Sequence, residues 1–174
     1  RPDPTSFPFR GASDAVQAIE FPYRRSPDQD AAAPVQHPVV VVGAGPVGLT
    51  LAIDLAQRGQ RVVVLDNDHK LSFGSRALCF AKRTLEIYGR LGLGERMREK
   101  GITWKTGRVF HGDREAYAFD LLPEEGHEYP AFVNLQQYYA EEWLVEACAE
   151  AGVELRWRHR ITGVEPGEAG ARLL

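Results

Sequence analysis

The sequence has 174 residues, of which 44% are hydrophobic, and a formal net charge of -3 at pH 7. This length suffices for one ordinary domain with an apolar core, and the acidic balance argues against a nucleic-acid-binding protein. The apolar runs are short, so we expect neither a membrane span nor a signal peptide. Cys79 and Cys148 lack metal-ligand spacing, so we expect reduced thiols in a cytoplasmic protein without a metal.

The first part of the chain, residues 1–38, holds seven prolines, many polar residues and no sustained periodicity. We expect an N-terminal extension that is partly disordered or lies along the surface. Residues 12–20 could form two helical turns. The extension could be passive or could contact a partner subunit, and a homo-oligomer stays possible.

The stretch from His37 to Asp66 predicts a strand, a glycine turn, a helix and a second strand. Residues 39–42 are four valines, which suit a parallel strand covered on both faces. Residues 47–58 place apolar side chains at helical spacing, and Gly59 is placed to end that helix. Residues 61–65 then supply the second strand.

The turn between the first strand and the helix reads Gly43-Ala44-Gly45-Pro46-Val47-Gly48. The three glycines allow a tight turn, a close approach of the backbone to a pyrophosphate, and close packing of helix on strand. The helix N-terminus offers unpaired N–H groups and the positive end of a dipole. The bland alternative is that the glycines serve only a tight connection between strand and helix.

Asp66 ends the second strand, about 20 residues beyond the glycines, where a carboxylate can accept hydrogen bonds from ribose hydroxyls. A carboxylate there disfavours a 2′-phosphate, so we expect the ADP half of FAD or NAD rather than of NADP. Asn67, the next residue, completes the predicted nucleotide site.

The remainder of the chain continues the mixed pattern. We expect helices over residues 81–91, over the following piece that reaches residue 100, and over residues 136–151, the last ended by Gly152. A hairpin turns at Gly112-Asp113 between strands 103–110 and 115–119. Shorter extended pieces are expected over residues 131–135, 153–157, 161–165 and 171–174.

Four places together resemble the single-component FAD monooxygenases of the para-hydroxybenzoate hydroxylase type, and most closely the branch typified by 3-(3-hydroxyphenyl)propionate hydroxylase. They are Gly43-Ala44-Gly45-Pro46-Val47-Gly48-Leu49, the acid Asp66, Ser75-Arg76-Ala77-Leu78 with Lys82-Arg83-Thr84-Leu85-Glu86, and Asn134-Leu135-Gln136-Gln137 ahead of Glu141 and Leu144. The resemblance covers about two thirds of the chain, from residue 39 to about 157, and it is specific in combination.

This resemblance implies roles for further residues. Arg76 matches an arginine that lies along the pyrophosphate and flavin, a task that suits a guanidinium. Gln137 matches a glutamine that hydrogen-bonds the ribityl chain of FAD, since an amide can both donate and accept. Gln136 is an adjacent alternative, and we favour Gln137 from its spacing to Glu141 and Leu144. The plainer alternatives are an ordinary loop arginine and a solvated glutamine at a helix start.

The resemblance also implies an activity. NAD(P)H would reduce FAD, and the reduced flavin with O2 would hydroxylate an electron-rich aromatic ring, with the cofactor supplying the oxygen chemistry. No catalytic acid, base or nucleophile is required from this segment, so the catalytic residues are unknown. His69, His111, His127 and His159 lack the spacing of a metal site or triad. Another FAD- or NAD-dependent oxidoreductase, or a non-catalytic cofactor-binding module, stays open.

We therefore predict an α/β, Rossmann-like FAD-binding fold with a parallel sheet in the order 3-2-1 and a β-hairpin excursion. The predicted division is an extension (1–38), an FAD-binding βαβ unit with its following helices (39–101), a hairpin excursion toward a substrate domain (102–130) and a return to the FAD domain (131–174). The sequence contains no counterpart of the family's later Asp-Gly and Gly-Asp motifs, since its one Gly-Asp pair is Gly112-Asp113 in the predicted hairpin turn. Residues 39–42 would form an apolar edge strand. We expect an incomplete domain, finished by the rest of the polypeptide or by a second chain.

Overall fold

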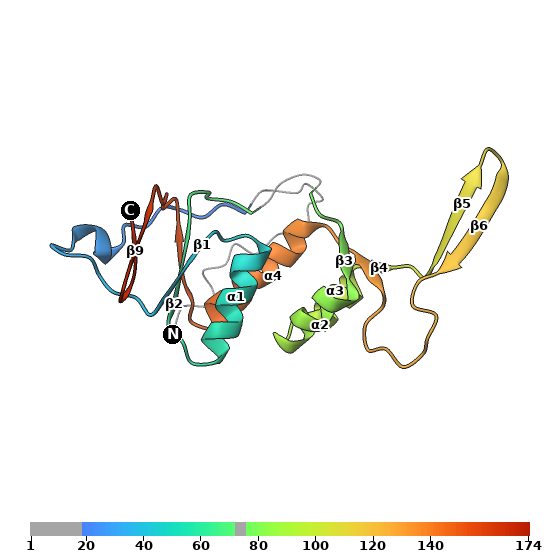
Figure 1. The fold of residues 1–174 in the computed structure, drawn as a ribbon, viewed down its shortest axis with the longest axis horizontal. Helices are drawn as coiled ribbons and strands as arrows, with labels where there is room; N and C mark the ends of the chain where they lie inside the picture. The colour runs from blue at the N-terminus through green and yellow to red at the C-terminus, as the bar shows by residue number, and fades with distance from the viewer. Residues whose placement is uncertain (1–18, 72–75) are drawn as a thin grey trace. The chain divides into compact units, whose positions relative to one another are not determined.

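The computed structural model describes residues 19–71 and 76–174, coloured in chain order in Figure 1. The chain divides into two compact units, which are described in turn. The first comprises residues 1–73 and 141–174, and the second comprises residues 74–140. Helix α4 (Gln137–Glu150) begins in the second unit and ends in the first.

The first unit is built on a parallel sheet of three strands, β1 (Val39–Val42), β2 (Val62–Asp66) and β8 (Glu154–Trp157), in the order β1-β2-β8. This is the predicted 3-2-1 order. Residues 62–65 of the central strand are all buried, as expected for a parallel strand covered on both faces. The register places Asp66 beside Trp157 at the carboxyl end of the sheet.

Helix α1 (Pro46–Gln57) follows the glycine turn and buries Leu49, Ala52 and Ile53. It ends as predicted at Gly59, which has a φ of +80°, and the N–H of Gln60 donates to the carbonyl of Leu55. In this unit the buried residues of α4 include Leu144, Val145 and Cys148.

The edge position of β1 agrees with the prediction. Within residues 19–71 and 76–174, β1 pairs with β2 alone. Val42 is 56% exposed, and Leu51 on the neighbouring helix is 48% exposed. Strands β9 (Val164–Gly167) and β10 (Gly170–Leu173) form a separate antiparallel pair. The prediction for the first of these, residues 161–165, began three residues too early, because only residues from 164 onward enter the ladder.

The second unit contains a small antiparallel sheet in the order β3-β7-β4, from β3 (Cys79–Ala81), β7 (Phe132–Asn134) and β4 (Ile102–Thr103). The two predicted helices are present as α2 (Lys82–Arg90) and α3 (Gly94–Lys100), and they contact β3 and β4 respectively. Strand β3 was not predicted. The buried core of this second unit includes Leu85, Tyr88, Met97, Val133 and Leu135.

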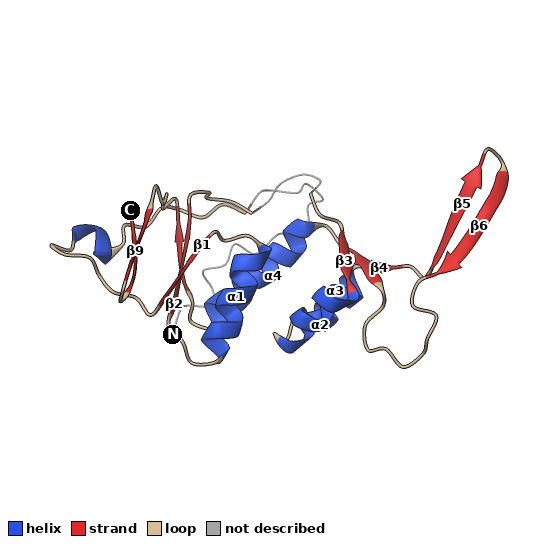
Figure 2. Ribbon diagram, in the orientation of Figure 1, coloured by secondary structure: helices blue, strands red, loops and turns tan. Residues whose placement is uncertain are grey.

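The predicted hairpin is present as β5 (Thr106–His111) and β6 (Arg114–Asp120), with Gly112 at a φ of +60° in the turn (Figure 2). The first strand starts three residues later than expected, because Thr103 pairs with β7 instead. Every residue of β6 is exposed, including two aromatic residues, Tyr117 and Phe119.

Residues 19–38 follow a defined path within the first unit. The 3-10 helix η2 (Pro27–Asp30) is capped by Ser26, and Glu20 forms an antiparallel bridge with Lys70. The helix expected over residues 12–20 is therefore not formed at Glu20, because this residue pairs as a strand. Ile19 is not helical either, and residues 12–18 of that expected helix lie outside the described residues.

Candidate functional site

The turn between β1 and α1 requires glycine at its first and third glycine positions for reasons internal to the fold. Gly43 has a φ of +106°, a conformation that side chains disfavour, and its N–H donates to the carbonyl of Leu65 at 2.8 Å. A Cβ on Gly48 would lie 2.0 Å from the carbonyl oxygen of Gly43. Gly43 thus shapes the turn, and Gly48 lets the helix pack against it.

Gly45, the middle glycine, is different. Its φ of -80° is open to any residue, and a Cβ built on it would meet nothing within 4 Å. The fold therefore leaves free space above this residue without requiring it for its own packing. Gly45 is also the N-cap of the 12-residue helix α1, and it provides no side-chain cap for the N–H groups of the first turn.

These features fit a bound pyrophosphate. Exposed backbone at Gly45, a helix N-terminus without a side-chain cap, and Pro46 at the first helical position leave N–H groups and a positive dipole end available to an anion. Val47, in the same turn, is 84% exposed. The space that a Cβ at Gly45 would fill is the space that a phosphate would need.

The carboxylate of Asp66 points toward the turn. Its Oδ2 accepts a hydrogen bond from the N–H of Ala44 at 2.5 Å, and its Oδ1 accepts from the N–H of Asp68 at 2.7 Å. A carboxylate offers about four lone-pair positions, so both oxygens can still accept from ribose hydroxyls. The bond to Ala44 was not predicted from the sequence. Asn67, which follows, is exposed.

In the second unit the structure brings together the segments that carry Arg76 and Gln137. The side-chain Oε1 of Gln137 accepts from the N–H of Ala77 at 3.1 Å, although these residues are 60 positions apart. The N–H of Leu135 also donates to the carbonyl of Leu78 at 2.7 Å. Arg76 is exposed, and its neighbour Ser75 lies outside the described residues.

The structure separates the two candidate glutamines. Gln137 is half-buried at the start of α4 and holds the segment that carries Arg76, whereas Gln136 is exposed. The predicted residues thus form two groups, each within its own unit: residues 43–48 with Asp66 and Asn67 in the first, and Arg76 with Gln137 in the second.

Sequence reasoning missed a contact that attaches residues near the start of the chain to β8 in the first unit. Asp28 accepts a hydrogen bond from Arg156 of β8, although the two are 128 positions apart. This bond is the first cause that holds the pKa of Asp28 below its ordinary value. A local signal was available, because Ser26 and Gln29 have the spacing of a capping box, and the structure contains that box.

Comparison with known proteins assigns the chain to a family. Residues 36–173 match the family described as "FAD binding domain". The chain belongs to this family. The match covers the glycine turn, Asp66, Arg76 and Gln137, and it confirms the predicted fold class and the predicted resemblance to FAD monooxygenases. The finer placement in the 3-(3-hydroxyphenyl)propionate hydroxylase branch stays a prediction.

Among curated relatives, para-nitrophenol 4-monooxygenase from Pseudomonas sp. (strain WBC-3) is 32% identical over 135 residues, which are 75% of this chain and 33% of that protein. Rifampicin monooxygenase from Streptomyces venezuelae is 34% identical over 132 residues, which are 76% of this chain and 27% of that protein. The chain therefore spans a third or less of the length of these relatives.

Solved structures of related proteins match the fold of this chain. The flavin-dependent monooxygenase PieE, in complex with FAD and substrate, matches 80% of this FAD-domain chain with a TM-score of 0.69 and 28% identity, over 26% of its own chain. The Diels-Alderase PyrE3, from the biosynthetic pathway of pyrroindomycins, matches 78% with a TM-score of 0.59 and 25% identity, over 28% of its own chain.

Across residues 19–71 and 76–174, every helix is too short or too polar to cross a lipid bilayer.

Proposed function

We propose that this chain is the FAD-binding segment of a flavin-dependent monooxygenase that hydroxylates an aromatic, phenolic substrate with NAD(P)H and O2. One observation carries the proposal: the turn is open above Gly45, and the carboxylate of Asp66 reaches Ala44 in the same turn. The family match and the relatives named as monooxygenases support the reaction class, and the relative named for para-nitrophenol supports a phenolic substrate.

The proposed binding roles follow from the chemistry of each group. The backbone of residues 43–48 holds the pyrophosphate, and Asp66 with Asn67 holds the adenosine ribose. Arg76 is proposed to lie along the pyrophosphate and flavin, because its guanidinium is exposed and permanently charged. Gln137 is proposed to bind the ribityl chain through its amide group.

When it is bound, FAD supplies electron transfer and oxygen activation. The residues of this chain bind and orient the cofactor, and the carboxylate of Asp66 fixes its adenosine end. We assign no catalytic acid, base or nucleophile to these residues, so the reacting groups other than the flavin belong to the substrate and to other parts of the protein.

A second candidate is a protein that uses the same FAD fold for another purpose. The likeness to the Diels-Alderase PyrE3 favours keeping it, because that protein is named for a cycloaddition rather than a hydroxylation. Other FAD- or NAD-dependent oxidoreductases, and a cofactor-binding module without catalysis, belong to the same group of alternatives.

At the level of the whole protein, we propose that further polypeptide completes the FAD domain beside β1 and provides the substrate domain reached by the hairpin of residues 102–130. The exposed edge of β1 and the share of each relative that the chain spans support this. We also propose a cytoplasmic location, supported by two cysteines that are both free thiols. Self-association into a homo-oligomer remains a proposal.

The test uses the full polypeptide as the cell makes it. A yellow preparation with flavin absorption, and oxidation of NADH or NADPH that accelerates on adding a phenol such as para-nitrophenol with formation of a hydroxylated product, is the expected result. Flavin absorption without accelerated NAD(P)H oxidation for a panel of phenols would favour the second candidate. A preparation that binds NAD but not FAD would contradict the proposal.

A further inference from the structure

The segment from Ile19 to Pro38, here called the N-terminal arm, attaches to the loop that follows Asp66. The N–H of Phe21 donates to the carbonyl of His69 at 2.6 Å, and the N–H of Leu71 donates to the carbonyl of Ile19 at 3.1 Å. Ile19 and Leu71 are both buried. The arm thus adds a short antiparallel pairing to a loop that begins directly after the nucleotide-binding acid.

Two aromatic residues of the arm then cover the residues beside Asp66. Phe21 stacks on Trp157, with ring centroids 4.3 Å apart and an interplanar angle of 6°, and Trp157 is the register partner of Asp66 in the sheet. Tyr23 stacks on His159 at 5.3 Å. The backbone N–H of His159 donates to the carbonyl of Asp66 at 2.8 Å. Each of the two aromatic contacts of the arm is therefore made to a residue that is itself a direct neighbour of Asp66.

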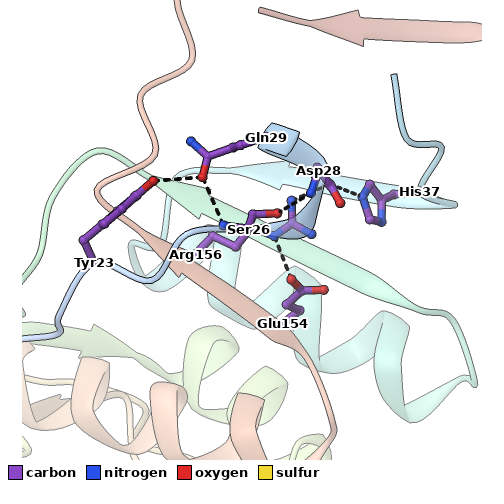
Figure 3. Close-up of polar contacts among 7 residues, drawn as sticks. All are labelled: Tyr23, Ser26, Asp28, Gln29, His37, Glu154 and Arg156. Atoms are coloured by element: carbon purple, nitrogen blue, oxygen red, sulfur yellow. Dashed lines mark hydrogen bonds and ion pairs between the residues drawn. The ribbon is translucent and has the colours of Figure 1, made fainter. Parts of the chain in front are cut away.

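A polar cluster around Arg156 and Asp28 also attaches the arm to β8 (Figure 3). Arg156 of β8 donates from Nη1 to Oδ2 of Asp28 at 2.6 Å and from Nε to Oε1 of Glu154 at 2.7 Å. The Nε2 of His37 lies 2.6 Å from the same Oδ2 of Asp28. The side chain of Arg156 is only 10% exposed, so this contact is shielded from solvent more than an ordinary surface ion pair.

The arm contacts both faces of β8. Successive side chains of a strand point to opposite faces, so Trp157 and Arg156 lie on opposite sides of the sheet. Phe21 contacts the first, and Asp28 contacts the second. The arm therefore passes around β8, which pairs only with β2 among the described residues, and then continues into β1.

We propose that the N-terminal arm is a positioning segment for Asp66, and that it sets the affinity of the protein for the adenosine half of FAD. This inference rests on the proposed function of Asp66. The acid is the last residue of β2, and its carboxylate must stay directed at Ala44 to meet a ribose. The arm braces Trp157 and His159 beside Asp66 and His69 after it, which restricts the backbone that carries the carboxylate.

A double-mutant cycle in the full polypeptide tests whether the arm acts through Asp66. Two variants weaken the attachment of the arm and are here called the arm variants. Arg156→Met, in β8, removes the polar attachment to Asp28, and Phe21→Leu, in the arm itself, removes the stack on Trp157. Arg58→Met is the matched control, because Arg58 forms an exposed ion pair with Asp54 on α1. Each is made alone and together with Asp66→Ala, with Asp66→Asn as the replacement if the alanine variant does not fold. The apoproteins are titrated with FAD, and their thermal midpoints are measured.

Asp66→Ala is expected to weaken FAD binding roughly tenfold to hundredfold, as for loss of hydrogen bonds to a charged group. Each arm variant is expected to weaken it roughly threefold to tenfold alone, and by less than about twofold in the Asp66→Ala background. Arg58→Met should leave the affinity unchanged.

Equal losses from the arm variants in both backgrounds, or no loss, would overturn the inference and leave the arm as a cover for the sheet. An Asp66→Ala variant with unchanged FAD affinity would overturn the proposed role of Asp66, and this single variant reports that outcome separately from the arm.

Discussion

At the scale of single residues, the three glycines of the turn do three separable things. Gly43 adopts a positive φ, and Gly48 makes room for the carbonyl of Gly43, so both are needed by the folded chain itself. Gly45 has an ordinary φ and open space where its side chain would be. The packing of the described residues does not require glycine at this position, which makes Gly45 the residue that best separates the proposed FAD binding from stability.

We expect Gly45→Ala to fold normally and to lose FAD affinity, by roughly tenfold or more, because a methyl group would occupy the space of the pyrophosphate. The free energy of unfolding of the apoprotein should change by only about 0.5 kcal/mol. Gly48→Ala is the matched control, and it should destabilise the apoprotein by about 1–3 kcal/mol through overlap with Gly43. FAD titration and chemical denaturation of both variants decide the matter. Unchanged FAD affinity in Gly45→Ala would refute the site.

Asp28 gives a prediction about pH. The hydrogen bond from Arg156 is the first cause that lowers its pKa below the ordinary value of 3.8, and His37 adds to it. A carboxyl whose pKa is lower in the folded state stabilises the fold above its unfolded pKa, and this contribution is lost as pH falls through the folded pKa. The free energy of unfolding should therefore fall below about pH 3.8.

Because other carboxyls titrate in the same range, the quantity to measure is the difference between wild type and Asp28→Asn in denaturant unfolding from about pH 6 down to pH 2.5. That difference should be largest near neutral pH and should shrink on acidification. A difference that stays constant with pH would show that the charge of Asp28 does not stabilise the fold.

At the scale of elements, one buried contact joins α4 to α1 in the first unit. Cys148 of α4 is fully buried and lies with its Sγ 3.8 Å from the carbonyl oxygen of Leu49 on α1. Burial raises the pKa of this thiol to about 12. Cys79, at the start of β3, is exposed. The two thiols therefore report on different parts of the chain.

We expect a thiol-alkylating reagent at pH 8 to modify Cys79 in the native protein and to reach Cys148 only after unfolding, because a buried thiol with a raised pKa is rarely a thiolate. Mass spectrometry of peptides from native and denatured samples measures this. In Cys79→Ser the native protein should take up no label within the described part of the chain. Rapid labelling of native Cys148 would mean that the contact between α1 and α4 opens easily.

At the scale of the whole molecule, the elements predicted correctly are those whose signals are local. The four valines of β1, the glycine turn, Gly59 and the turn at Gly112 each specify their structure within a few residues. Strand β3 has no such signal, because it is defined by pairing with β7 more than fifty positions later. The attachment of the N-terminal arm likewise depends on Arg156, and only the capping box at Ser26 indicated local order.

The local structure around the candidate site was also predictable only where its signals are local. The turn and its acid followed from spacing, whereas the bond from Ala44 to Asp66 and the contact between Ala77 and Gln137 depend on tertiary structure. Arg76 and Gln137 were named only through the resemblance to a family, within which the spacing to Glu141 and Leu144 favoured Gln137, and their binding roles stay proposals.

The exposed edge of the parallel sheet leads to a prediction about residues 1–174 produced alone. Strand β1 pairs with β2 only, within the described residues, and exposed apolar surface is contributed by Val42 of this strand and by Leu51 of the helix that follows it. Unpaired apolar edges promote association, so we expect self-association that grows with concentration in sedimentation velocity experiments.

The double variant Val42→Lys with Leu51→Lys should shift the isolated chain toward monomer, because charge at an edge opposes pairing with a second copy. Phe110→Lys is the matched control, since Phe110 is as exposed as Val42 but lies on the hairpin of the other unit. If only the hairpin variant Phe110→Lys restores the monomer, the self-association is mediated by the aromatic hairpin of β5 and β6 and not by the edge of β1. In that case β5 and β6, rather than β1, would be the candidate surface for the proposed further polypeptide.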